Sequence, residues 1–156
     1  MMLLFIERIV QDILEQLDGL SDETLNAVPP LPNANTLLAT ATHVVGMGEF
    51  WILALVGGQT IARDRDAEFR AKGNGNELRE RFKVWVSHCR PVLMNISEHT
   101  LDEIVEPPAS FRLTGGFAST QLTKRECLFH VIEHSATHLG QIQITRQIWL
   151  NLDRSK

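Results

Sequence analysis

The sequence predicts an all-α protein built as a four-helix bundle. Four segments, about 3–18, 35–56, 76–96 and 123–150, repeat apolar residues at spacings of three and four, the pattern of helices that bury one face. Clusters of proline and glycine separate these segments, and there is no strand of consequence and no internal repeat. A chain of 156 residues can form a substantial core, so we expect a single domain over residues 1–156.

The first predicted helix carries an evenly spaced apolar stripe. The stripe consists of Leu3, Ile6, Val10, Ile13 and Leu17. Gly19 is suited to end the helix, and Ser21 can cap a short turn after it. The proline-rich stretch 28–32 then excludes regular structure, because proline removes a backbone donor and restricts the residue before it.

The second predicted helix carries two apolar stripes side by side. Asn33 or Asn35 can cap it, and the glycine pair at 57–58 ends it. Gly46 and Gly48 each cost about 1 kcal/mol relative to alanine inside a helix. They indicate a break in the helix, or a place where another backbone comes close or space is reserved.

The third predicted helix follows Asn74 or Asn76, either of which can cap it. Its inner side consists of Leu78, Phe82, Trp85, Cys89, Val92 and Ile96. Pro91 falls inside this pattern and predicts a kink or an early end, because proline cannot donate the helical hydrogen bond.

Two long connections, residues 57–75 and 97–122, flank the third helix. Long connections in a compact domain are usually functional or mobile. We interpret the charged run 63–70 in the first connection as a solvated loop. An alternative is that its arginines attract an anionic substrate: Arg63, Arg65 and Arg70.

The last predicted helix carries a stripe of three histidines. Thr123 and Glu126 form a capping-box pattern at its start, in which each side chain satisfies a free backbone donor. His130, His134 and His138 follow at four-residue spacing, so their side chains lie one above the other on one face. Apolar residues flank the stripe, so the histidines face inward or lie at the edge of the inward face.

Imidazoles on the inward face of a helix need a hydrogen-bond partner or a metal ion, because burying a polar group without one costs free energy. Two histidines four residues apart on a helix can bind one metal ion. Bundle proteins build such sites from facing helices, and His43, isolated on an apolar face of the second helix, is the natural partner for the pair in the last one. The alternatives are a core histidine bonded to a carbonyl and a row of hydrogen-bonded core or surface histidines.

The sequence resembles the DinB/YfiT-like superfamily of metalloenzymes. The resemblance is carried by His43 in the second helix, by the run HSATHLGQI from His134 to Ile142 in the last helix, and by the lead-in 29–35. Together with the helix spacing, it covers nearly the whole chain. The H-x-x-x-H-x-G-Q run paired with a histidine in the second helix is more specific than either part.

The resemblance implies an up-down-down-up four-helix bundle, a divalent metal held by three histidines, and frequent homodimers. Matched residue by residue, the implied ligands are His43, His134 and His138, whereas His130 falls outside the set and would play a supporting role. Gln141 lies one turn beyond His138 and could orient a ligand or bound water, or be an exposed polar residue. Characterised family members include transferases and isomerases that use low-molecular-weight thiols such as bacillithiol, mycothiol or glutathione.

The composition and the net charge limit which binding partners and which cellular location we expect. A net charge of −4 offers no cationic surface for nucleic acid or for an anionic membrane. The sequence shows neither a signal peptide nor an apolar run of transmembrane length. Cys89 and Cys127 form no CxxC motif and no disulfide framework. We therefore expect a cytoplasmic protein in which both cysteines are small buried apolar residues.

These observations predict a divalent-metal-binding protein, and more specifically an enzyme. A metal with an open position would activate a thiol or water, as in a thiol-dependent transferase or a hydrolase acting on a small molecule. A zinc peptidase is not expected, because HSATH lacks the glutamate of HExxH. The absence of a convincing general base favours thiol transfer over hydrolysis. Zinc is the default metal for three imidazoles, with nickel, iron or manganese as alternatives.

Two other functions fit the same sequence. One is a non-enzymatic, dimeric helical bundle that binds metal or a small ligand in a stress response. The other is a purely structural bundle whose histidines are incidental.

Overall fold

The computed structural model describes residues 1–111 and 121–153, and the chain is predominantly helical, as predicted. Its elements in chain order are α1 (Met2–Leu17), α2 (Asp22–Asn26), α3 (Leu37–Gly48), the π-helix η1 (Glu49–Val56), α4 (Arg65–Phe69), α5 (Gly75–Asn95), α6 (Glu98–Leu101), β1 (Ile104–Val105), the 3-10 turn η2 (Ala109–Phe111), β2 (Leu122–Thr123) and α7 (Lys124–Asp153).

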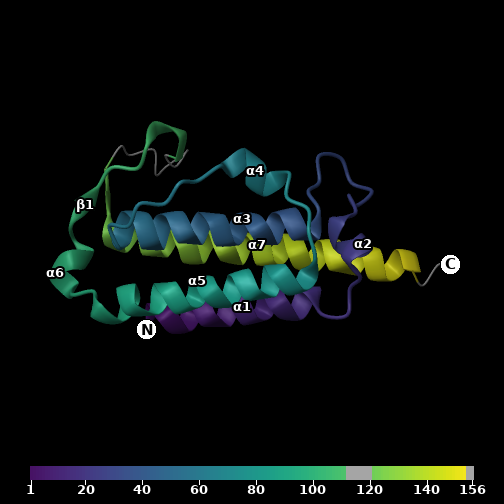
Figure 1. Cartoon of the computed structure of the whole chain (residues 1–156), viewed down its shortest axis with the longest axis horizontal. Coiled ribbons are helices and arrows are strands. Elements are labelled where there is room, and N and C mark those ends of the chain that lie inside the picture. The colour runs from purple at the N-terminus through teal and green to yellow at the C-terminus, as the bar shows by residue number, and fades with distance from the viewer. Residues whose placement is uncertain (112–120, 154–156) are drawn as a thin grey trace.

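The long helices lie side by side (Figure 1). Helix α1 packs against α5 and α7, and α3 packs against the same two helices. Helices α1 and α7 run in one direction, whereas α3 and α5 run in the other (Figure 1). The connection between η1 and α5 returns along the outside of α3, where α4 packs against that helix. A short antiparallel pairing of β1 with β2 leads the second connection back to the start of α7.

Helix α3 is buried on every side, whereas α1 buries only the predicted stripe. A helix that is apolar all round belongs in a core or a membrane. Contrary to the sequence-based expectation, residues 37–56 are long and apolar enough to cross a membrane by length and composition. However, 83% of the apolar window is buried inside the protein, so this segment acts as the central helix of the core.

The helix starts confirm most of the predicted caps. The Ser21 hydroxyl accepts from the backbone of α2, and the Asn74 side chain accepts from that of α5. At α7 the Glu126 carboxylate accepts from the Thr123 backbone N–H at 2.7 Å, and the Thr123 hydroxyl accepts in return, which confirms the capping box. The cap of α3 is Thr36, so the prediction of an asparagine there was wrong.

Two predicted interruptions take different forms. The second helix does not break at its glycines, but its hydrogen bonding changes from α to π after Gly48. Helix α5 continues through Pro91 and ends at Asn95. Since a proline removes one hydrogen bond, and Pro91 lies in the last two turns, the remaining helix tolerates it.

The glycines of α3 reserve space for side chains and not for another backbone. A Cβ atom on Gly46 would lie 2.2 Å from Oε1 of Glu68, and one on Gly48 would lie 2.0 Å from Cζ2 of Trp85. Trp85 belongs to α5 and is fully buried, so Gly48 lets α3 and α5 approach closely. Gly46 instead makes room for a carboxylate that arrives from α4.

We predict that Gly48→Ala destabilises the protein by about 1–3 kcal/mol, because the added methyl overpacks a buried contact. This cost exceeds the gain of about 1 kcal/mol that alanine brings to a helix. The matched control is Gly140→Ala in α7, where an added Cβ meets nothing within 4 Å, and this change should stabilise the protein slightly. Urea unfolding of both variants checks the prediction. Equal stability of Gly48→Ala and the unmodified protein would contradict it.

Candidate metal centre

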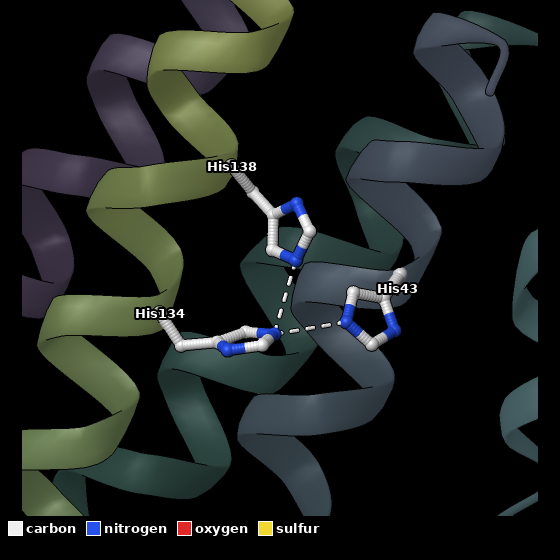
Figure 2. A group of neighbouring side chains, drawn as sticks. All are labelled: His43, His134 and His138. Atoms are coloured by element: carbon white, nitrogen blue, oxygen red, sulfur yellow. Dashed lines mark hydrogen bonds between the residues drawn. The ribbon is translucent and has the colours of Figure 1, made fainter. Parts of the chain in front are cut away.

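Three histidine side chains converge where α3 packs against α7 (Figure 2). His43 comes from the middle of α3 and is 2% exposed, while His134 and His138 lie one turn apart on α7. The Nε2 atom of His134 lies 3.0 Å from Nε2 of His43 and 3.0 Å from Nε2 of His138. The structure thus brings together the three residues that the sequence predicted as ligands.

A buried carboxylate sets the orientation of His43. Oε2 of Glu68 lies 2.7 Å from Nδ1 of His43. Burial raises the pKa of the Glu68 carboxyl, but hydrogen bonds from Arg63 and His43 outweigh that effect and bring the pKa below its usual value. An ionised carboxylate can only accept, so a neutral His43 carries its proton on Nδ1 and turns the Nε2 lone pair toward His134.

Gln141 has the same relation to His138. The Gln141 oxygen Oε1 lies 2.8 Å from Nδ1 of His138, one turn further along α7. An amide oxygen accepts hydrogen bonds, so Nδ1 of a neutral His138 donates and Nε2 presents its lone pair. Ligand histidines in metal sites are commonly held in this way, with the second ring nitrogen bonded to a carboxylate, carbonyl or other acceptor.

The environment keeps the α7 histidines neutral near pH 7. Burial, followed by the charges of the neighbouring histidines and Arg63, lowers the pKa of His134 to about 3. Burial likewise lowers the pKa of His138, although its hydrogen bond to Gln141 opposes the shift. Neutral imidazole is the form that ligates metals.

The donor set fits a divalent cation. His134 can place at most one proton between itself and its two neighbours, both of which direct lone pairs toward it. A cation among the three Nε2 atoms would satisfy all of the lone pairs at once. Tetrahedral zinc with imidazoles at 2.0–2.1 Å holds their nitrogens roughly 3.3 Å apart, close to the 3.0 Å between His134 Nε2 and the Nε2 atom of each neighbour.

The connection between η1 and α5 covers this site. The charged run 63–70 within it, predicted to be a solvated loop, is solvated only in part, because it contains the short helix α4 and buries the side chains of Arg63 and Glu68. Phe69 stacks on the His43 ring at a centroid distance of 4.3 Å. Arg63 donates to Glu68 from Nε at 2.8 Å and from Nη2 at 2.9 Å. Only 5% of the Arg63 side chain and 7% of the Glu68 side chain is exposed. Arg65 remains exposed and lies over the Phe69 ring.

Sequence reasoning missed Glu68 and Arg63 as parts of the site. The two residues stand among other charged residues, and no local spacing links them to His43. The available signal was Gly46, which lies one turn after His43 and has a buried carboxylate where its side chain would be.

His130 lies beside the site but outside the converging set. Its ring centroid is 4.5 Å from that of Trp51 in η1 and 5.0 Å from that of His134. Burial and the charge of Arg63 lower its pKa to about 4. His130, Glu133 and His134 also lie close enough to share an ion, but Glu133 is exposed and its carboxylate is 3.9 Å from His130 Nδ1.

The cysteines behave as small buried apolar residues. Cys89 and Cys127 are both 0% exposed. Burial raises the pKa of each thiol to about 12, so neither forms the reactive thiolate near neutral pH.

The chain resembles known proteins both in sequence and in fold. Over 114 residues the chain is 26% identical to an uncharacterised protein, YizA, of Bacillus subtilis, a match that covers 73% of this chain and 65% of the relative. The fold is shared with a conserved protein from Enterococcus faecalis, at a TM-score of 0.73, 14% identity, and coverage of 96% and 95% of the two chains. A DinB-like protein from Bacillus cereus matches at a TM-score of 0.65 and 18% identity, over 92% of this chain and 89% of that one.

The likeness to the solved structures concerns the fold alone, because the sequences are so different. The family model described as mycothiol S-transferase matches residues 1–149, which is most of the chain. The chain therefore belongs to the mycothiol S-transferase family of DinB-like proteins.

Proposed function

We propose that this protein binds a divalent metal through His43, His134 and His138 and uses it to activate a thiol, as a thiol-dependent S-transferase. The observation that carries the proposal is the convergence of three Nε2 atoms, two of them on rings held by hydrogen bonds at Nδ1. We further propose that residues 1–156 form one domain with the up-down-down-up four-helix bundle topology. Two antiparallel core helices would then hold the ligands rigidly.

Three imidazoles would leave at least one coordination position open, as in catalytic metal sites. When bound there, a divalent ion lowers the pKa of a thiol or water and so supplies a nucleophile near neutral pH. Zinc is the metal we propose, and nickel, iron and manganese are compatible with the same donors.

A thiol is favoured over water as the activated group. Hydrolysis needs a base for the water proton, and the buried carboxylate next to the site, Glu68, is already bonded to Arg63 and His43. The match to the mycothiol S-transferase family also supports a low-molecular-weight thiol as co-substrate. The cytoplasmic location and the homodimer stay predictions from the sequence.

Metal content tests the ligand set. The protein, purified without an affinity tag and quantified by mass spectrometry of metals, should carry about one divalent ion per chain. His43→Ala and His134→Ala should each lose most of it, since each removes a ligand. The exposed His88 provides the control, and His88→Ala should keep the full content. Unchanged metal in the first two variants would show that the site is elsewhere.

Thiol-dependent turnover tests the reaction. The metal-loaded protein should conjugate a model electrophile, monochlorobimane, when supplied with at least one of mycothiol, bacillithiol and glutathione. His134→Ala should lower this rate by more than the 10- to 100-fold that is typical when a residue supporting a ligand is lost. Product formation is followed by chromatography. A protein that retains metal but shows no thiol-dependent turnover would be a binding protein instead.

The stability of the metal-free protein should fall as the pH drops below about 6.5. In that range the unfolded chain protonates His134, whereas the folded chain, with a pKa of about 3, does not. The unfolded state therefore binds more protons, and the free energy of unfolding decreases with falling pH by up to about 1.4 kcal/mol per pH unit for this group.

Urea unfolding at pH 7 and pH 5 measures this dependence. His134→Gln should make the loss of stability smaller, and the control His88→Gln should leave it unchanged. Equal losses in all three proteins would show that His134 titrates normally in the fold.

A further inference from the structure

The His43 imidazole is held by a chain of contacts that begins outside the two ligand helices. Arg63 precedes α4, Glu68 lies within it, and His43 is in α3. Arg63 donates to both oxygens of Glu68, at 2.8 and 2.9 Å, and Oε2 of Glu68 accepts from Nδ1 of His43 at 2.7 Å. The bidentate guanidinium contact fixes the plane of the carboxylate, and the carboxylate fixes the direction in which the ring points.

Two further features restrict the same carboxylate and ring. Gly46 has no side chain at the position that Oε1 of Glu68 occupies, since a Cβ there would lie 2.2 Å from that oxygen. Phe69, the residue after Glu68, stacks on His43 with an angle of 26° between the rings. The ring is therefore held both at its edge, through Nδ1, and on its face.

Stability alone does not account for burying this ion pair. A buried pair must compensate for the water that both charges lose, and replacing such pairs with apolar residues of similar volume is often neutral or stabilising. Helix α4 could therefore pack on α3 through apolar residues alone. The feature that apolar residues could not supply is an acceptor at Nδ1 of His43.

We propose that Glu68, clamped by Arg63, is the positioning residue of the metal centre. It fixes His43 as the Nδ1–H tautomer and aims Nε2 at the point where His134 and His138 converge. This inference rests on the proposed metal site. It means that residues of the connection between η1 and α5 orient one of the ligands. Arg63 acts one step further away, by holding the carboxylate in plane through its two hydrogen bonds.

A double variant separates positioning from structural support. Arg63→Met combined with Glu68→Leu removes both charges and keeps an apolar filling, so no unpaired charge remains buried. Asp66→Asn is the matched control, because Asp66 is an exposed carboxylate in the same short helix. Circular dichroism and urea unfolding establish that each variant is folded.

The first readout is the tautomer of His43 in the metal-free protein, from long-range 1H–15N NMR spectra of the imidazoles near pH 7. In the unmodified protein and in Asp66→Asn, His43 should be protonated on Nδ1 and not on Nε2. In the double variant this preference should disappear. A His43 that carries its proton on Nε2 in the unmodified protein overturns the proposal, whether or not any variant folds.

The second readout is zinc affinity, measured by competition with a chelator. The double variant should bind zinc 10- to 100-fold more weakly than the unmodified protein, as is typical when a partner of a ligand is lost. Asp66→Asn should bind normally. Equal affinity in a folded double variant overturns the positioning role. If the unmodified protein itself bound no zinc, the proposed function would fail, while the NMR readout would still decide whether Glu68 orients His43.

Discussion

The site depends on one buried carboxylate, that of Glu68, which forms an ion pair with Arg63 and accepts a hydrogen bond from His43. A carboxylate that is 7% exposed is costly to bury unless its oxygens are satisfied, and here both oxygens accept from charged or polar donors. The position of α4, the glycine at residue 46 and the orientation of the His43 ring are therefore linked. A change in any one of them leaves a buried polar group without a partner or forces two groups into the same space.

The long helices and the connection between η1 and α5 contribute different parts of the site. Helices α3 and α7 supply the converging nitrogens, because a helix holds residues four apart on one face and the core holds the two helices together. The connection between η1 and α5 supplies the charged groups of Glu68 and Arg63, and its Phe69 covers the His43 ring. Helices alone would bring the imidazoles together, but the orientation of His43 depends on the connection.

Much of the fold, and the residues that converge at the candidate site, could be predicted from local periodicity together with the resemblance to DinB-like proteins. The stripe of α1, the capping box of Thr123 with Glu126, and the spacing of His134 and His138 are properties of single helices. His43 could be added because one imidazole on an apolar helix face needs a partner. These features require only the geometry of a helix and the cost of burying a polar group. The choice of His134 and His138 over His130 came from the resemblance to DinB-like proteins.

Other features of the site and of its helices could not be predicted, because they depend on contacts between segments that are distant in the sequence. Nothing local distinguishes Glu68 from the exposed acids around it, because its burial is set by the way the connection returns along α3. The glycines of α3 were recognised as costly, but the groups that fill their space come from α4 and α5. The change to π-helical hydrogen bonding after Gly48 likewise has no counterpart in the apolar pattern.

The proposed function requires that His43, His134 and His138 bind one metal ion through Nε2. A crystal structure of the zinc-loaded protein, with anomalous data collected on both sides of the zinc absorption edge, tests it most directly. We expect a single zinc peak about 2.0–2.1 Å from all three Nε2 atoms, with Glu68 still bonded to Nδ1 of His43. A peak bound through Nδ1 of His43, a peak away from these residues, or none at all would contradict it.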